Sequence, residues 1–315
     1  MKKILVITVL VVILLSAVYT HASCDTITIN GTKYILSSAE NYKDIPMIEN
    51  QAKNLYDALS DYPEVRTYVY LVNSSRTVDL NKDVSAVPDV YKAIEEYFSE
   101  STTDYLRLDS LEQYAEYFYS TDHHWNYQGS YAGYCQIVRM LLGEEEPVLQ
   151  PLETVVFPVR FNGSMNNSQG SDSSAEQFTV YRFDYPEMTI SVNGVRQASY
   201  GNQEIYFAGK YSKQPKFNHY SKFYGGDYGL IHFETERTDR GNLVLFSNSF
   251  SNAINLLLAS HFHHLWVIDF RYFLPEQNKS FHLPEILAQG DVQVLILGDG
   301  LYFTQNNPYQ KLMRP

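Results

Sequence analysis

Two short segments of the sequence carry side chains that could act together in catalysis. The first is TDHHWN at 121–126, in which Asp122 stands two residues before His124. The second is SNSFSNA at 247–253, which follows an apolar run and contains Ser249. A serine hydroxyl is a good nucleophile only when a base accepts its proton, and an acid must orient that base. Asp122, His124 and Ser249 could therefore supply the acid, the base and the nucleophile.

The same residues also allow simpler interpretations. A serine at the start of a helix often only caps that helix. Asp122 and His123 are adjacent potential metal ligands, but one adjacent pair is not a metal site, and we expect a structural role for His123 beside His124. Trp125 is either a substrate-binding platform for a sugar or a core residue that packs beneath this turn.

A second group of histidines lies in the segment SHFHHLW, which contains His261, His263 and His264. These residues fall between a predicted helix and a predicted strand, so we expect their side chains to diverge. Histidine is also favoured near a helix C-terminus by the helix dipole, and no matching carboxylate or cysteine spacing accompanies the group. The sequence therefore predicts no metal site here.

The segments that must position these residues alternate between strand and helix patterns. Apolar residues at helical spacing predict helices at 41–59, 87–98, 127–142, 251–262 and 283–288, with Asn126 as a cap for the third. Apolar and β-branched runs predict strands at 65–73, 242–246, 264–270 and 292–297. This order is typical of a parallel sheet covered by helices. Ser249 would then follow the carboxyl end of a strand, where ligand sites form in open α/β sheets.

The middle of the chain, at about 155–235, has a different pattern. Short alternating runs such as QFTVYRF and MTISVNG are separated by clusters of Asn, Gly and Ser. This pattern predicts an inserted antiparallel, β-rich region. The Asn, Gly and Ser-rich loop at 162–174 either faces substrate or is only a solvated loop.

Residues 1–22 have the pattern of a secretory signal, with Lys2 and Lys3 before an apolar run and small residues around Ala22. The run is shorter than the ~20 apolar residues that cross a bilayer comfortably. We therefore expect an extracytoplasmic protein, secreted or held on the outer face of the cytoplasmic membrane. A retained anchor and a lipid on Cys24 are the alternatives to cleavage. The remaining residues, 23–315, suit one large α/β domain or two small ones, and we expect one.

Composition excludes some classes of partner. The net charge of −12 argues against nucleic acid and anionic lipid. The 27 tyrosines suit sugar surfaces, but they equally suit half-buried sheets. The two cysteines, Cys24 and Cys135, either form one bridge or leave Cys135 as a buried thiol, and we expect the second.

Four segments together resemble a known family. They are TDHHWN at 121–126, GGDYGL at 225–230, SNSFSNA at 247–253 and WVIDFRYF at 266–273. In this order they resemble the DHHW family, which is similar to the alginate O-acetyltransferase proteins with SGNH-hydrolase-like domains. The resemblance covers most of the chain. It implies an SGNH-like α/β fold, with Asp122 as acid, His124 as base, Ser249 as nucleophile and Arg271 near the pocket.

The chain departs from that pattern in two places. The family usually has Gly and Asp before the nucleophile, whereas this chain has Ser247 and Asn248. Loss of a glycine at a strained turn is unfavourable, and Asn248 becomes a candidate substrate-binding residue. The family commonly has Asn after the last core strand, where this chain has Asp299. An acid there would repel an oxyanion.

The function expected from the sequence is that of an extracytoplasmic serine O-acetyltransferase or acetylesterase. Its substrate would be a cell-surface or secreted polysaccharide, and acyl transfer would pass through Ser249. We expect no cofactor, and the resemblance implies a membrane-bound partner that donates the acyl group. Arg271 either holds a polar substrate or pairs with Asp269. The alternative is a catalytically degenerate glycan-binding or scaffold protein of a polysaccharide-modification complex.

Overall fold

The computed structural model describes residues 26–36, 45–73, 88–98, 102–169, 176–214, 216–275, 277–299, 302–303 and 309. The predicted signal segment at 1–22 and Cys24 lie outside these residues. Within them, no helix combines the length and the apolar character that a membrane span requires.

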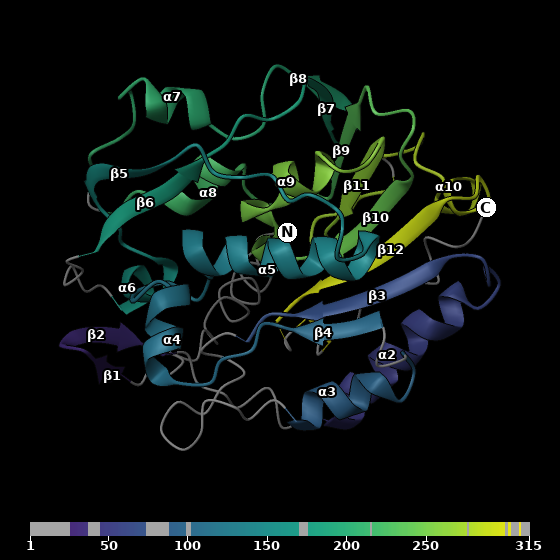
Figure 1. Ribbon diagram of the computed structural model, residues 1–315, viewed down its shortest axis with the longest axis horizontal. Coiled ribbons are helices and arrows are strands. Elements are labelled where there is room, and N and C mark those ends of the chain that lie inside the picture. Colours follow the sequence, from purple (N-terminus) through teal and green to yellow (C-terminus); the bar gives the residue numbers. More distant parts are fainter. Residues whose placement is uncertain are drawn as a thin grey trace, which may run out of the picture.

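An eight-stranded, mostly parallel sheet forms the centre of the molecule (Figure 1). Its strand order is β4-β3-β12-β10-β11-β9-β7-β8. These strands are β3 (Arg66–Leu71), β4 (Thr103–Tyr105), β7 (Met188–Val192), β8 (Val195–Gln197), β9 (Leu230–Thr235), β10 (Asn242–Ser247), β11 (His264–Ile268) and β12 (Val292–Gly298). The strands from β4 to β11 pair in parallel, and β9, β7 and β8 add antiparallel pairs at one edge.

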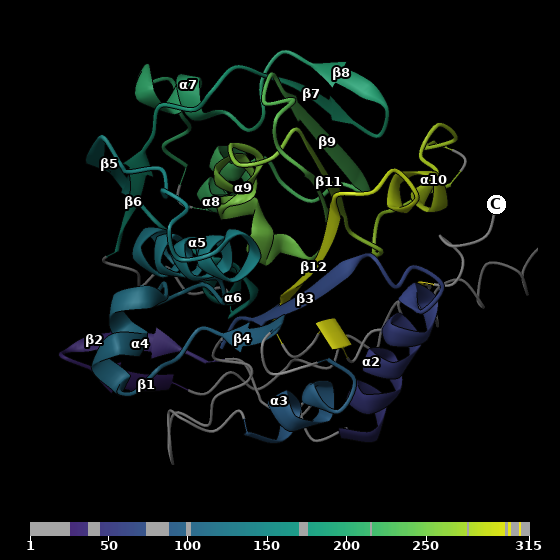
Figure 2. The same cartoon turned by 45° about the vertical axis from the view of Figure 1, so that its right-hand side comes forward.

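Helices cover both faces of this sheet. The described helices are α2 (Ile45–Leu59), α3 (Pro88–Glu95), α4 (Leu111–Tyr117), α5 (Tyr127–Leu142), α6 (Ser164–Gln169), α7 (Gln203–Phe207), α8 (His219–Tyr224), α9 (Asn255–Ala259) and α10 (Leu283–Leu287), and not all of them lie on the sheet. Figure 2 shows α5 and α9 on one side of the sheet and α2 and α3 on the other. The central strand β10 is buried continuously from Leu243 to Ser247, as expected for a parallel strand covered on both faces. The predicted fold class, a parallel sheet covered by helices, is confirmed.

Most of the predicted elements are found. The helix predicted at 127–142 is α5, and the side chain of Asn126 accepts hydrogen bonds from the backbone N–H groups of Gln128 and Gly129. The predicted strands at 65–73, 242–246, 264–270 and 292–297 are β3, β10, β11 and β12. The first predicted helix begins at 45 in the described residues, and the second ends at Glu95.

The prediction of one continuous helix at 251–262 is wrong. The chain instead makes a 3-10 helix, η3 (Ser249–Ala253), followed by the short helix α9. The reason is local: Ser251 N–H donates to Asn248 O and Ile254 N–H donates to Ser251 O, which are the tighter bonds of a 3-10 turn.

The predicted antiparallel region at 155–235 divides into two parts. Strands β5 (Glu153–Arg160) and β6 (Gln177–Arg182) form a separate antiparallel pair, as β1 (Thr26–Ile29) and β2 (Thr32–Ile35) do elsewhere. Strands β7, β8 and β9 instead extend the central sheet. A second hydrophobic core joins β5 and β6 to α7 and α8. Its largest members are aromatic: Tyr119, Phe157, Phe161, Phe178, Tyr206, Tyr220, Phe223 and Tyr224. This core holds α8 against the turn that carries Ser249.

Candidate active site

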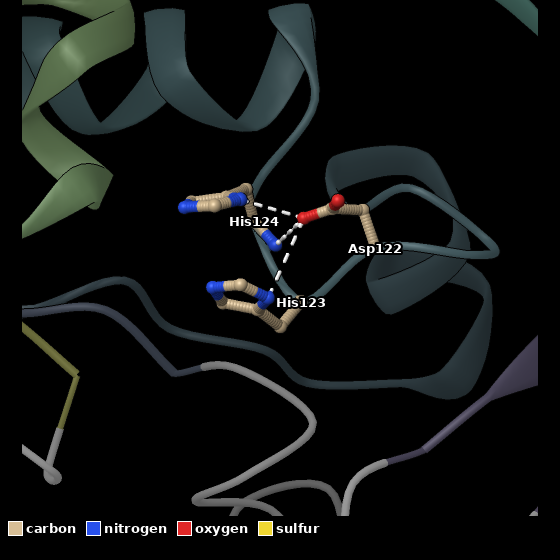
Figure 3. Close-up of side chains that lie close together, drawn as sticks. All are labelled: Asp122, His123 and His124. Atoms are coloured by element: carbon tan, nitrogen blue, oxygen red, sulfur yellow. Dashed lines mark hydrogen bonds and ion pairs between the residues drawn. The ribbon is translucent and has the colours of Figure 1, made fainter. Parts of the chain in front are cut away.

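Asp122, His124 and Ser249 form one continuous chain of hydrogen bonds. His124 Nδ1 lies 2.6 Å from Asp122 Oδ1, and His124 Nε2 lies 2.7 Å from Ser249 Oγ. A carboxylate can only accept, so Nδ1–H donates to Asp122 and Nε2 accepts the proton of the serine hydroxyl. Asp122 and His124 are buried, whereas Ser249 is half-buried. Figure 3 shows how Asp122 lies beside both histidines.

The turn between α4 and α5 fixes Asp122. Phe118 and Trp125 form an antiparallel bridge that closes this turn. Asp122 Oδ1 also accepts from the backbone N–H of His124 at 3.0 Å, and Oδ2 accepts from the backbone N–H of Ser164 at 2.6 Å. Burial alone would raise the pKa of Asp122, but the charge and the hydrogen bond of His124 and the Ser164 N–H outweigh it, so the pKa lies below its usual value. Asp122 therefore remains a carboxylate.

Gly163 allows this arrangement. A Cβ atom at this position would collide with the carbonyl oxygen of Thr121 and the Cβ of Asp122. Only glycine lets the 161–164 segment approach closely enough for Ser164 to donate to the Asp122 carboxylate. The functional importance of Gly163 has no signal in the local sequence, because the loop that contains it is rich in Gly, Asn and Ser throughout.

Ser249 is held at the end of β10. The hydroxyl of Ser247 donates to Leu297 O of β12 at 2.8 Å, which ties the strand end to its neighbour. Asn248 then caps η3, with its Oδ1 accepting from the Phe250 N–H at 3.2 Å. Neither Ser247 nor Asn248 has a left-handed backbone conformation. The strain expected from loss of glycine at this turn is therefore not found.

Tyr220 contacts both the base and the nucleophile segment. Its ring stacks on the His124 imidazole with centroids 4.1 Å apart, and its hydroxyl donates to Ser249 O at 3.0 Å. The sequence did not indicate this residue, because α8 is distant in the chain and Tyr220 is one of 27 tyrosines.

Of the two roles considered for Trp125, the structure supports the core residue and not the substrate platform. The side chain is fully buried and its Nε1 donates to Phe250 O at 3.0 Å. A Cβ at position 133 would lie 2.5 Å from the indole, so Gly133 of α5 makes room for it. The ring packs beneath the turns that carry His124 and Ser249, which leaves it no access to a substrate.

His123 contacts Asp122 and Ser164, the first residue of α6. Its Nδ1 lies 2.8 Å from Ser164 Oγ and 3.6 Å from Asp122 Oδ1, and its ring lies 3.9 Å from that of His124. One ligand atom from each of Asp122, His123 and His124 falls within 4.8 Å of the others. Both ring nitrogens of His124 already form hydrogen bonds, so this arrangement favours proton transfer over metal binding.

A cavity of about 270 Å³ opens in front of these side chains. It is lined by Ser249, both histidines and mainly polar neighbours, which come from several separate parts of the chain. Its lining is Asp122, His123, His124, Ser164, Asn218, Tyr220, Ser221, Asp227, Asn248, Ser249, Phe250, Asn252, Arg271 and Asp299. Asn248 and Arg271, both candidate substrate-binding residues, therefore line the same cavity as Ser249.

Arg271 is paired with two carboxylates. Its Nη2 lies 2.6 Å from Asp269 Oδ2 and 3.3 Å from Asp227 Oδ2, and its Nε also donates to Asp269. Asp227 in turn accepts from Asn252 Nδ2 at 2.9 Å. Of the two alternatives for Arg271, the pairing with Asp269 is found. Asp227 is an additional residue of the cavity, to which the sequence had assigned no role. The positive charge of Arg271 is thus largely balanced.

Asp299 lies next to the nucleophile turn. It follows β12 directly, is fully buried, and has its Oδ1 3.4 Å from Asn248 Nδ2. Asp299 therefore lines the same cavity as Ser249. Its position directly after the last core strand had predicted this.

The SHFHHLW histidines only partly diverge. His261 is buried, with its ring nitrogens 3.0 Å from Glu146 Oε1 and 2.6 Å from the Tyr134 hydroxyl. The rings of His263 and His264, however, lie 4.0 Å apart, so the expectation of divergence is wrong for this pair. The reason is a bend in the chain just before β11.

Cys135 is a free, half-buried thiol in α5, and burial raises its pKa. The possible bridge to Cys24 falls outside the described residues.

Comparison with known proteins shows which solved structures share this fold. No protein-family model and no curated protein matches the sequence. A DHHW family protein from Eubacterium siraeum is similar, with a TM-score of 0.66 and 19% identity over 93% of this chain and 96% of the other. PatB1 of Bacillus cereus, solved with a sulfonyl adduct, has a TM-score of 0.62 and 15% identity over 92% of this chain and 99% of its own. At such identities the likeness concerns the fold alone. This chain thus resembles a DHHW family protein over nearly its whole length and shares its fold.

Proposed function

We propose that this protein is an SGNH-type serine O-acetyltransferase or acetylesterase that acts on a polysaccharide outside the cytoplasm. The observation that carries the proposal is the hydrogen-bonded chain from Asp122 through His124 to Ser249 at the cavity. The cavity offers carboxylate, amide and hydroxyl groups, which suit a substrate rich in hydroxyl groups.

The first step would form an acyl-serine. Ser249 Oγ attacks the carbonyl carbon of an acetyl ester while His124 Nε2 takes the hydroxyl proton. Asp122 then faces the positive charge that develops on the imidazole, and the Tyr220 ring lies over its face. His124 next returns the proton to the departing alcohol oxygen, and the acetyl group remains on Ser249.

The second step would transfer the acetyl group to an acceptor. His124 removes a proton from water or from a sugar hydroxyl, whose oxygen attacks the acyl carbon, and the proton returns to Ser249 Oγ. Water gives an esterase, and a sugar hydroxyl gives a transferase. The family resemblance favours transfer, with a membrane-bound partner as the source of the acetyl group.

Negative charge on the carbonyl oxygen needs hydrogen-bond donors in both steps. The candidates are the backbone N–H of Ser249 and the Nδ2 of Asn248. Asn248 Nδ2 faces the carboxylate of Asp299 at 3.4 Å, and this contact weakens the donor. The same contact favours the second candidate function, a glycan-binding protein that retains the framework of an enzyme with little turnover.

Acetyl release from an activated acetyl ester tests the proposal. Wild-type protein should turn over, whereas Ser249→Ala and His124→Ala should lose at least about 10³-fold in kcat. Ser60→Ala is the matched control, because Ser60 is exposed after α2 and does not line the cavity, and it should retain nearly full activity. A sulfonyl fluoride, which reacts with activated hydroxyl groups, should label wild type and not Ser249→Ala.

Two results would argue against this proposal. Equal and negligible turnover by wild type and Ser249→Ala, combined with glycan binding by both, would support the second candidate. Turnover that survives in folded Ser249→Ala would assign the chemistry to another residue.

A further inference from the structure

One face of the central sheet, over strands β9 and β11, carries a second group of potential metal ligands. Strands β9 and β11 are antiparallel, with His232 opposite Trp266 and Glu234 opposite His264. These four side chains alternate with buried residues of the same strands, so they point to one face and away from the core. Figure 1 shows the two strands side by side.

His263 joins this group because the chain bends before β11. Its backbone is held on both sides: its N–H donates to Gly241 O at 3.0 Å and its carbonyl accepts from the Thr235 N–H at 2.9 Å. One ligand atom each from Glu234, His263 and His264 lies within 4.8 Å of the others. Ligand atoms around a tetrahedral zinc ion are about 3.3 Å apart. Small rotations of these three partly exposed side chains would bring them to that separation.

His232 orients one of the three. Its Nε2 lies 3.1 Å from His264 Nδ1, and its ring stacks on Trp266 with centroids 5.0 Å apart and 5° between the planes. The Nδ1 of His264 therefore already has a fixed hydrogen-bond partner, which leaves Nε2 to bind a metal ion. Histidine ligands of metals are commonly oriented in this way, through a hydrogen bond at the second ring nitrogen.

We propose that Glu234, His263 and His264 bind a divalent transition-metal ion of the Zn²⁺ class, with His232 as the residue that positions His264. Two imidazoles and one carboxylate are ligands typical of Zn²⁺, whereas Ca²⁺ and Mg²⁺ prefer oxygen ligands alone. Three protein ligands would leave one position of a tetrahedral ion for water.

This site is separate from the cavity that contains Ser249. His264 is the register partner of Asn242, the first residue of β10. Ser249 lies two residues beyond the last residue of that strand, Ser247, so the two groups lie at opposite ends of the sheet. A metal bound at Glu234, His263 and His264 should not alter the ester chemistry.

The proposal can be tested by treating the full protein with a chelator and then titrating it with Zn²⁺ in a calorimeter. Wild type should bind Zn²⁺, and His264→Ala and Glu234→Gln should each weaken binding by about tenfold or more. His282→Ala is the control for loss of a histidine elsewhere and should bind as wild type does. Co²⁺ should give the visible absorption of a tetrahedral ion in wild type and lose it in His264→Ala.

The Asp122, His123 and His124 cluster is the competing site, and His123→Ala separates the two. Binding that survives in His123→Ala and fails in His264→Ala supports the proposal. Binding that is lost in His123→Ala but unchanged in His264→Ala and Glu234→Gln overturns it, as does an absence of binding by wild type. If His264→Ala does not fold, Glu234→Gln, at an exposed side chain, decides the question.

Discussion

The imidazole of His124 lies almost parallel to the phenol ring of Tyr220, with centroids 4.1 Å apart and 14° between the two planes. The Tyr220 hydroxyl reaches past that ring and donates to the carbonyl of Ser249 at 3.0 Å. Burial raises the pKa of Tyr220 well above its usual value, so the hydroxyl remains a donor. One side chain of α8 thus holds the base and the nucleophile segment together.

Two substitutions of Tyr220 distinguish the effect of its stacking on His124 from that of its hydrogen bond to Ser249. Tyr220→Phe keeps the stacked ring, and we expect kcat for acetyl ester cleavage to fall by about threefold or less. Tyr220→Leu removes the aromatic face that orients His124 and faces its developing charge, and we expect a fall of about tenfold or more. Steady-state kinetics of the two variants, with circular dichroism to check folding, makes the comparison. Equal losses in both would assign the effect to the hydroxyl bond with Ser249.

Asp299→Asn should increase turnover. The carboxylate of Asp299 faces Asn248 Nδ2 beside the nucleophile, where it opposes negative charge on the carbonyl oxygen. An amide removes that repulsion and frees a donor, so we expect kcat to rise by roughly three- to tenfold. The measurement is kcat with the acetyl ester, accompanied by a thermal unfolding curve. A fall in kcat without a loss of stability would mean that the carboxylate itself is needed to hold Asn248.

Asp227→Asn should change the preference for charged substrates. Asp227 and Asp269 together balance Arg271, so the cavity offers little attraction for an anionic substrate. Loss of the more exposed partner, Asp227, should raise kcat/KM for an acetyl ester that carries a carboxylate, relative to a neutral ester of similar leaving group. A gain of about two- to fivefold is expected for one partly exposed charge. Asp239→Asn, at an exposed side chain, should leave the ratio unchanged, and an equal change there would indicate only an effect of net charge.

Glu176→Gln should stabilise the protein above neutral pH. Burial raises the pKa of Glu176 to about 7 from its ordinary 4.5, and hydrogen bonds from Ser120 only partly oppose this. Because the folded pKa is the higher one, the stability that the protonated group contributes is fully present below pH 4.5 and is lost as the pH rises through 7.

The neutral amide of Glu176→Gln has no such loss. At pH 8 its free energy of unfolding should exceed that of wild type by up to roughly 3 kcal/mol, and the difference should disappear near pH 4.5. Urea unfolding at both pH values measures this. Glu153→Gln, at an exposed side chain, should change the free energy by less than about 0.5 kcal/mol. A difference for Glu176→Gln that is the same at both pH values would contradict the assignment.

The sequence by itself determined the elements and the types of residue that do the chemistry. Helix α5 could be predicted from its first to its last residue, because apolar periodicity and the Asn126 cap are local signals. The central strands could be predicted from continuous apolar runs. Asp122 and His124 could be recognised as a pair because only two residues separate them, and Ser249 because it follows a strand.

Only the tertiary structure decided which distant residues meet. His124 and Ser249 are 125 positions apart, and their hydrogen bond depends on how α5 and β10 pack, which no local pattern specifies. The same holds for Tyr220 on α8 and for Asp227 beside Arg271. Glu234 and His264 come together through the register of β9 and β11. A one-residue change of register would turn each of these side chains to the other face of the sheet, so pairing between strands, and not sequence spacing, places them.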